Sequence, residues 1–394
     1  MSGPVEPMSM RPTHVSPMTV AAQRFATLTA GAKTPPAGVA LALRGTGPDE
    51  LDLSMVTGNR TAGTEVAPMT SGTIHDLASV TKIVATTTSL IRLASDGVVD
   101  LDDPVVRYLP GFTGEGRDSV TLKHLLSHRG GLWEWQPLYL SAADSPWEYI
   151  ERLPLRYRPD SGRHYSDLGF MLLGRVIATV CGQGLAEAVT RLVIEPLGLT
   201  DTGFARPIGT EVAASAHGDD AERRMVATGT PYPILTDATF TDWRLRPILG
   251  EVNDGNAFRV FGGVSGHAGL FGSITDLVTF GSALARYRDH PRLWRAEVVE
   301  RFLAPGPDAG QSLGFRSWDL AGTTFYGHPG FVGCAVGFSP DADLVVALCT
   351  NRLLTDGTPM SNDDLWSVAE AAAHTAMTGR EPVISTPRRQ GDHD

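Results

Sequence analysis

The segment "LASVTKIVATTTSLIRLAS", residues 77–95, combines a helical pattern with one unusual residue. Its apolar residues recur at the spacing that places them on one face of a helix, and Asp96-Gly97 supplies a stop signal. Lysine stands only at positions 33, 82 and 123, although Lys and Arg together number 33. Because Arg supplies nearly all the other basic side chains, the lysine at position 82 raises the question of whether its placement is chemical or accidental.

Ser79 and Lys82 lie three residues apart, so a helix starting at Ser79 would bring both side chains to one face. A serine hydroxyl is a weak nucleophile until a neighbour accepts its proton, and a buried lysine with a lowered pKa can be that neighbour. The same residues also fit a helix-capping serine and a lysine that extends to solvent. The tetrapeptide alone leaves both interpretations open.

Two later stretches favour the chemical interpretation. Tyr165, Ser166 and Asp167 occur in "GRHYSDLGFMLLGRVI" (162–177), and His328 precedes Pro-Gly in "FYGHPGFVG" (325–333). With Ser79–Lys82 they resemble, in order, the three signature elements of the serine β-lactamase and penicillin-binding-protein superfamily. The resemblance is closest to class C β-lactamases and family VIII esterases. It extends over residues 18–378 and includes "LLSHRGGL" (125–132), "EPLGLTDTGF" (195–204) and "GGVSGHAGLFGS" (262–273).

The resemblance implies a role for each matching residue. Ser79 corresponds to the acylating nucleophile and Lys82 to its proton partner. Tyr165 corresponds to the residue that activates Ser79 and later the deacylating water, and a cationic Lys82 would lower its pKa. The backbone N–H groups of Ser79 and Phe331 would form the oxyanion hole. His328 stands where relatives carry Lys or His, and no metal or cofactor is implied.

Two residues depart from the family pattern. Asp167 replaces the usual Asn, and an ionised carboxylate accepts hydrogen bonds but cannot donate one to a substrate carbonyl. Asp167 can also pair with Lys82 and hold it charged. His328 in place of Lys lowers the positive charge available to a substrate carboxylate. Both changes argue against an efficient β-lactamase or carboxylate-recognising peptidase, and leave ester hydrolysis and acyl transfer open.

Several weaker signals surround these motifs. Trp133 and Trp135 follow the "LLSH" segment, where aromatic rings would make an acyl pocket or simply join the core. Gly330 adjoins the expected oxyanion amide and is included in the substrate site. His124 and His128 have a spacing that can hold zinc, but their place in the family segment favours a structural role.

The order of elements predicts a mixed α/β (α+β) fold of the β-lactamase/transpeptidase type. Strands near both ends are expected to form one antiparallel sheet, flanked by N- and C-terminal helices, with a mainly helical domain inserted. The expected ranges are 18–78 and 306–380 for the sheet domain and 79–305 for the helical domain. Residues 1–17 and 381–394 are expected to be disordered.

Composition restricts the partners and the compartment. A formal net charge of −11 disfavours nucleic acid as the main partner, and no apolar run is long enough for a membrane span. Three widely spaced cysteines and an N-terminus without a signal-peptide pattern favour the cytoplasm. The oligomeric state is left open.

The leading hypothesis is a cofactor-independent serine hydrolase that acts as an esterase on a small-molecule ester or amide. The alternatives are acyl transfer to an amine or alcohol, and a β-lactamase or D-peptidase. A non-catalytic ligand sensor of the same fold is the alternative from another class. A sensor would be expected to lack Ser79, Lys82 or Tyr165, and all three are present.

Overall fold

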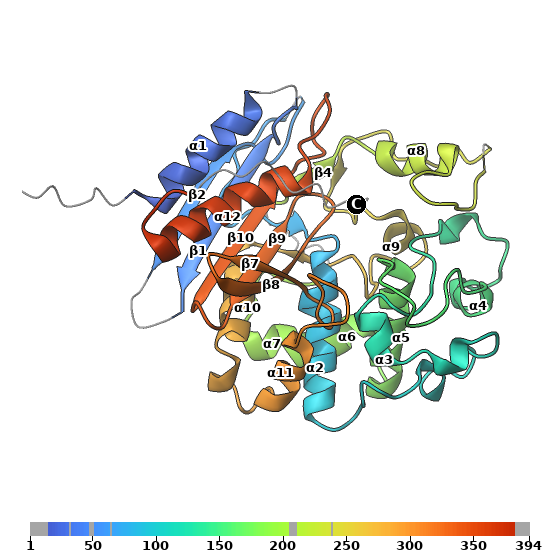
Figure 1. Cartoon of the computed structure of the whole chain (residues 1–394). Coiled ribbons are helices and arrows are strands. Elements are labelled where there is room, and N and C mark those ends of the chain that lie inside the picture. The colour runs from blue at the N-terminus through green and yellow to red at the C-terminus, as the bar shows by residue number, and fades with distance from the viewer. Residues whose placement is uncertain are drawn as a thin grey trace, which may run out of the picture.

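The computed structural model describes residues 15–30, 33–46, 51–63, 65–204, 211–237 and 239–382. The segments expected to be disordered, 1–17 and 381–394, fall largely outside these ranges. Within the ranges, strands from both ends of the chain form one sheet, and most of the helices lie in the segment between them (Figure 1).

The central sheet has six strands in the order β2-β1-β10-β9-β8-β7, with every neighbouring pair antiparallel. The N-terminal strand β1 pairs with β10 near the C-terminus, with Val39 opposite Thr350. The prediction of a sheet shared by the two ends is therefore confirmed. The strands are β1 (Gly38–Gly45), β2 (Asp52–Gly58), β7 (Arg316–Leu320), β8 (Thr323–Pro329), β9 (Ala335–Ser339) and β10 (Leu344–Thr350).

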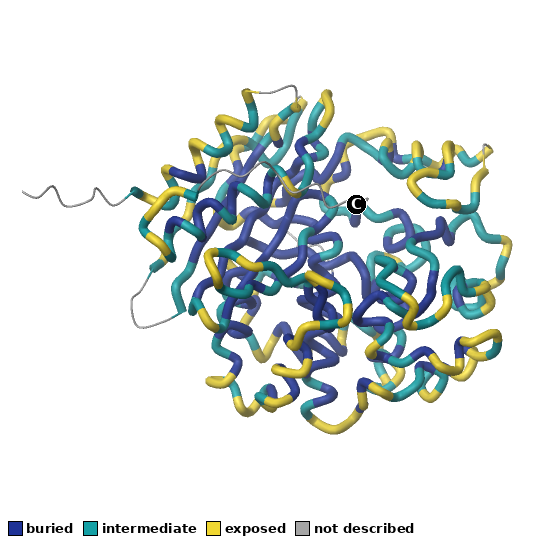
Figure 2. The backbone as a smooth tube through the Cα atoms, viewed as in Figure 1, coloured by how far each residue is buried: buried dark blue, intermediate teal, exposed yellow. Residues whose placement is uncertain are grey.

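Both faces of the sheet are covered by helices. In β1, the larger side chains Val39, Leu41 and Leu43 pack toward α1 (Pro17–Thr29) and α12 (Asn362–Thr378). The small side chains between them face the other core, on the side of α10 (Ile274–Ala285). This two-residue alternation follows from the geometry of a strand, and burial on both faces explains the continuous apolar sequence of β10. Figure 2 shows that the interior of the sheet is buried, whereas exposed residues lie at the periphery of the molecule.

The helix α10 lies within the 79–305 range expected for the helical domain, yet it packs against the sheet.

No described helix is by itself long and apolar enough to cross a membrane. Among the described residues, only α5 (Asp167–Cys181) taken together with the bent continuation Leu185–Leu197 reaches that length and composition. The other helices of four or more residues are α2 (Thr88–Ser95), α3 (Leu122–Leu126), α4 (Pro146–Arg152), α5 (Asp167–Cys181), α6 (Leu185–Val189), α8 (Asp220–Thr228), α9 (Gly255–Arg259) and α11 (Ala296–Leu303).

The helix expected from Ser79 onward differs in detail. Ser79 lies in a turn, Lys82–Thr87 form a π-helical segment, and the regular helix α2 begins only at Thr88. All six residues of the π segment are buried, so packing from every side fixes its wider winding. A π segment inside a helix is frequent at functional sites.

Candidate active site

The turn that carries Ser79 is held by its neighbours. Ala78, directly before the serine, has a φ of 44°, a conformation that costs energy for a residue with a side chain. The buried Asp76 carboxylate accepts hydrogen bonds from Ala78 N at 2.8 Å and from Asn253 N at 2.6 Å. Burial raises the pKa of Asp76 to about 6, although these two N–H donors lower it. The strained turn is thus fixed by a carboxylate that the sequence motifs do not include.

The Ser79 hydroxyl lies between two proton carriers. Lys82 Nζ donates to Ser79 Oγ at 2.8 Å, and the Tyr165 hydroxyl donates to the same oxygen at 3.0 Å. Lys82 comes from the π segment, whereas Tyr165 precedes α5, which begins at Asp167. Tyr165, which follows Ser79 by 86 positions, therefore meets Lys82 on one oxygen, as the family resemblance predicts.

Lys82 is completely buried, and its ammonium group contacts two further groups besides Ser79. Its Nζ lies 2.7 Å from Asp167 Oδ1 and donates to the His267 carbonyl at 3.2 Å. Burial alone lowers the pKa of Lys82, but Asp167 and Tyr165 outweigh it, and the net pKa is raised. The prediction of a lysine with a lowered pKa is wrong for this reason, whereas the expected Lys82–Asp167 pair is confirmed.

The predicted effect of Lys82 on the pKa of Tyr165 is present, but burial outweighs it and the net pKa is raised. The ring packs against His128, with centroids 4.5 Å apart, and His128 Nδ1 accepts from the Ser166 amide at 3.0 Å. Burial brings the pKa of His128 well below its usual value. His128 is therefore a neutral support for the tyrosine, while His124 caps α3 with Thr121, so the two histidines do not form a zinc pair.

The remaining family positions lie at the end of β8. His328 is buried, its Nδ1 is 2.6 Å from the Pro329 carbonyl, and burial brings its pKa well below the usual value. Gly330 approaches the chain beside the nucleophile so closely that a Cβ would lie 2.5 Å from the Leu77 carbonyl. Among the described residues, the amides of Ser79 and Phe331 donate to no protein acceptor. Both amides are thus available to an oxyanion.

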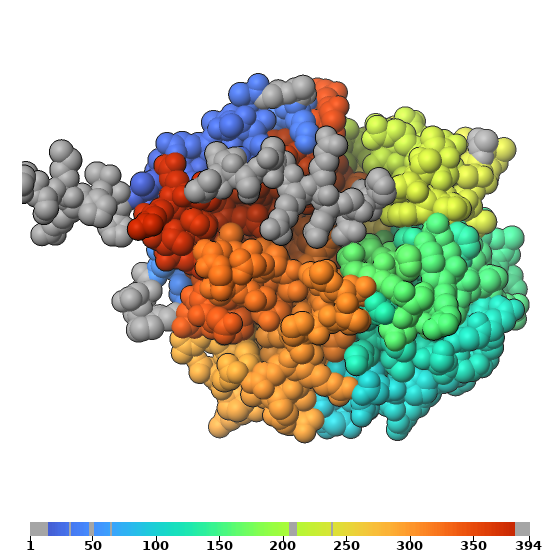
Figure 3. Space-filling model, in the orientation of Figure 1, coloured from blue at the N-terminus to red at the C-terminus, as the bar shows by residue number. Residues whose placement is uncertain are grey.

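A cavity of about 990 Å³ opens over these groups. Ser79, Tyr165, His328 and Phe331 line it, as does Trp135 from the predicted aromatic segment. Trp133 is not among the lining residues, because its indole N–H donates to the Pro154 carbonyl and its ring lies under Arg156. In the space-filling view, the region around α8 and the C-terminal strands form separate parts of the surface (Figure 3).

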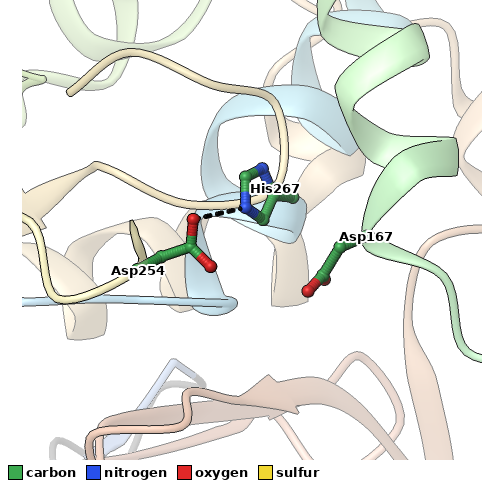
Figure 4. A group of neighbouring side chains, drawn as sticks. All are labelled: Asp167, Asp254 and His267. Atoms are coloured by element: carbon green, nitrogen blue, oxygen red, sulfur yellow. Dashed lines mark hydrogen bonds and ion pairs between the residues drawn. The ribbon is translucent and has the colours of Figure 1, made fainter. Parts of the chain in front are cut away.

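The loop 253–268 brings residues to the site that sequence reasoning did not assign. Asp254 Oδ1 lies 2.9 Å from His267 Nε2 (Figure 4). Ser265 Oγ lies 2.8 Å from His267 Nδ1. Thr86 donates to the Gly266 carbonyl at 2.6 Å and thereby ties the loop to the π segment. Ser265 and His267 lie in "GGVSGHAGLFGS", which contributes above only to the family resemblance, whereas Asp254 lies before this stretch.

Asp167, Asp254 and His267 offer ligand atoms within 4.8 Å of one another. Two carboxylates and an imidazole are ligands suited to a divalent cation. A cation bound by all three groups would share Asp167 with the Lys82 ammonium, which lies 2.7 Å from Oδ1, and would face its like charge. The arrangement does not fit a resident metal, and the position beside Asp167 belongs to the lysine.

Comparison with known proteins bears on this arrangement. The Beta-lactamase family model matches residues 22–371. A putative D-alanyl-D-alanine carboxypeptidase of Escherichia coli (strain K12) is 31% identical over 318 residues, covering 72% of this chain and 70% of that protein. Two solved structures share the fold. An octameric penicillin-binding protein homologue from Pyrococcus abyssi has a TM-score of 0.68 and 19% identity, covering 93% of this chain and 77% of that chain. EstCE1, a hydrolase with promiscuous acyltransferase activity, has a TM-score of 0.66 and 21% identity, covering 90% of this chain and 99% of that chain.

Proposed function

Because the chain belongs to the Beta-lactamase family, we propose that it is a serine hydrolase that forms an acyl-enzyme on Ser79 and acts on a small-molecule ester or amide. The observation that carries the proposal is the position of Ser79 Oγ, 2.8 Å from Lys82 Nζ and 3.0 Å from the Tyr165 hydroxyl. A nucleophile within hydrogen-bond distance of two proton carriers is the arrangement that covalent catalysis requires.

The protonation states define the acylation step. With Lys82 charged and Tyr165 neutral, both groups donate to Ser79 Oγ and neither can accept its proton. The active form is therefore the one in which the pair has lost one proton. Ser79 then passes its proton to the pair as Oγ bonds to the acyl carbon, and the proton leaves with the departing alcohol or amine. The free amides of Ser79 and Phe331 would stabilise the oxyanion.

Ester substrates are favoured over β-lactams and over peptides that end in a carboxylate. Asp167 is paired with Lys82 and has no proton to donate to a substrate amide carbonyl. His328 has a strongly lowered pKa, so it supplies no positive charge for a carboxylate at neutral pH. Three free cysteines, at positions 181, 334 and 349, favour a reducing compartment such as the cytoplasm for this activity.

Acyl transfer to an amine or alcohol is the second candidate. The cavity of about 990 Å³ is at the large end for a small-molecule site, and thus has room for an acceptor beside a small acyl group. Water and an organic acceptor would compete for the same acyl-enzyme. Product analysis in the presence of added alcohols and amines distinguishes hydrolysis from transfer.

The test is intact-mass detection of an acyl adduct after incubation with a panel of esters, amides and β-lactams. We expect an adduct that Ser79→Ala lacks, together with sustained turnover of at least one ester. A single stoichiometric burst would favour a ligand sensor over an enzyme. An adduct of equal yield in Ser79→Ala would place the nucleophile elsewhere.

A further inference from the structure

One carboxylate oxygen in the cavity has no partner. Asp254 uses Oδ1 twice, accepting from Ala257 N at 2.7 Å and contacting His267 Nε2 at 2.9 Å. Among the described residues, Oδ2 has no hydrogen-bond partner, and Asp254 lines the cavity that contains Ser79. In Figure 4 this second oxygen points away from His267, on the side where Asp167 lies. A carboxylate oxygen that faces a cavity in this way is ready to accept from a ligand.

The charges around Ser79 leave this carboxylate unbalanced. Lys82 neutralises Asp167, with Nζ and Oδ1 2.7 Å apart. Asp254 has no such ammonium beside it: its Oδ1 contacts the His267 ring, whose other nitrogen lies 2.8 Å from Ser265 Oγ. A singly charged cation at Oδ2 would therefore meet a carboxylate that pairs with no lysine or arginine among the described residues.

The other carboxyl groups of the cavity have partners of their own. Glu222 accepts from the Tyr139 hydroxyl at 2.6 Å and the Gly255 amide at 3.0 Å, and burial raises its pKa to about 8. It therefore stays largely protonated at neutral pH. The remaining acidic residues pair with basic ones: Asp219 with Arg244 and Arg259, Asp220 with Arg223, and Asp356 with His217. The lining residue Arg224 is exposed on α8.

His328 is a second group in the same cavity that can accept a hydrogen bond from a ligand. It is only 4% exposed and lines the cavity beside Tyr165. Because the Pro329 carbonyl only accepts, His328 Nδ1 carries the proton and Nε2 is left as an acceptor. Nε2 is buried and has no partner among the described residues. An acceptor here does not suit a carboxylate ligand.

From these groups we infer that the cavity binds an acyl donor that carries a free, positively charged amino group, with Asp254 Oδ2 as its principal acceptor. The substrate class is an ester or amide of an amino acid, or a short peptide with a free amino end. This inference rests on the proposed acyl-enzyme at Ser79 and adds the recognition of the acyl part. Asp254 binds the ammonium and leaves proton transfer to Lys82 and Tyr165.

Matched methyl esters test the inference on the wild-type chain. The series consists of α-alanine (both enantiomers) and β-alanine methyl esters, N-acetylalanine methyl ester, methyl propionate and monomethyl succinate, at a pH where the amines are protonated. We expect at least one free-amine ester to exceed methyl propionate in kcat/KM by about tenfold or more, because a charge-assisted hydrogen bond forms only with the ammonium. The acetylated and succinyl esters should fall below the free-amine ester.

Variants locate the subsite. Asp254→Asn should bring the ratio of free-amine to neutral ester toward one, whereas Asp356→Asn, at an exposed carboxylate of the same cavity, should leave the ratio unchanged. If Asp254→Asn does not fold, inhibition of wild-type methyl propionate hydrolysis by alaninamide and propionamide gives the same answer. Stronger inhibition by alaninamide supports the subsite, and equal inhibition overturns it.

Labelling with a neutral fluorophosphonate separates this inference from the proposed function. A wild-type chain that is labelled at Ser79 but shows no preference for free amines overturns the ammonium subsite alone. A chain that is not labelled overturns the acyl-enzyme proposal itself. A preference for monomethyl succinate would contradict the inferred charge of the cavity directly.

Discussion

Lys82 Nζ and Asp167 Oδ1 lie 2.7 Å apart, so the lysine beside the nucleophile is stabilised in its charged form. An ammonium held in this way donates to Ser79 and cannot take its proton. The carboxylate that distinguishes this chain from typical β-lactamases therefore controls the proton balance of the site. Its effect is open to measurement through the pH dependence of activity.

Asp167→Asn should move the rising limb of the pH–activity profile to lower pH. Burial lowers the pKa of Lys82, and Asp167 raises both this pKa and that of Tyr165. Removing the carboxylate charge lowers both pKa values, so the pair loses its proton earlier as pH increases. The measurement is kcat/KM for a p-nitrophenyl ester as a function of pH. An unmoved or alkaline-shifted limb would show that neither Lys82 nor Tyr165 limits acylation.

The same substitution should also alter substrate preference. Wild type is expected to hydrolyse a p-nitrophenyl ester far better than the β-lactam nitrocefin, because Asp167 offers no donor to the amide carbonyl. An Asn donor is worth about 0.5–1.5 kcal/mol, so the preference should narrow by roughly tenfold at most. The ratio of the two kcat/KM values is compared in both proteins at the pH optimum of each. Efficient nitrocefin hydrolysis by wild type would contradict the ranking of ester substrates.

Lys82→Arg should be nearly inactive. Arginine keeps the positive charge but cannot give up its proton, and its larger head must enter a fully buried position. The expected loss of kcat/KM is on the order of 10³-fold or more, as for removal of a residue that takes part in proton transfer. Circular dichroism of the variant tests whether the fold is kept. A folded Lys82→Arg chain with most of its activity would reduce Lys82 to an electrostatic role.

Gly266→Ala should lower both stability and activity. A Cβ there would lie 2.2 Å from the Phe170 carbonyl and 2.9 Å from Gly174, and backbone atoms yield little. Overpacking of this kind costs about 1–3 kcal/mol of unfolding free energy. Because the next carbonyl, of His267, accepts from Lys82, the displaced loop should also reduce kcat/KM.

Gly72→Ala is the matched control for that prediction. Gly72 is exposed, and a Cβ there would come no nearer than 3.9 Å to Thr70 Oγ1. Denaturant unfolding and ester hydrolysis are measured on both variants. Equal effects at the two positions would contradict the close contact between the 253–268 loop and α5.

The fold and the central residues followed from the sequence because they rest on local patterns and ordered motifs. Several features can be read from the sequence alone. They are the alternation in β1, the cap of α5 by Ser166, and the motifs that contain Ser79, Lys82 and Tyr165. The antiparallel sheet shared by both ends of the chain and its flanking helices, α1 and α12, agree with the expectation.

The sequence alone could not predict the direction of the pKa shifts or which residues line the cavity. The raised pKa values of Lys82 and Tyr165 depend on burial and on the distance to Asp167, which appear only in the folded chain. Asp254 and Asp76 belong to no signature motif, and their partners come from distant segments. Trp133 and Trp135 are two residues apart, yet only Trp135 lines the cavity.

The pairing of β1 with β10 also sets the order in which the chain can mature. Val39 can pair with Thr350 only after some three hundred intervening residues have been synthesised. Because closing so long a loop is slow, formation of the complete sheet is delayed. The segment with Ser79 leaves the ribosome well before His328 and the Phe331 amide. A chain that stops between these segments would carry Ser79 without the second amide proposed for the oxyanion hole, so efficient acylation of Ser79 would report that the later strands of the sheet are in place.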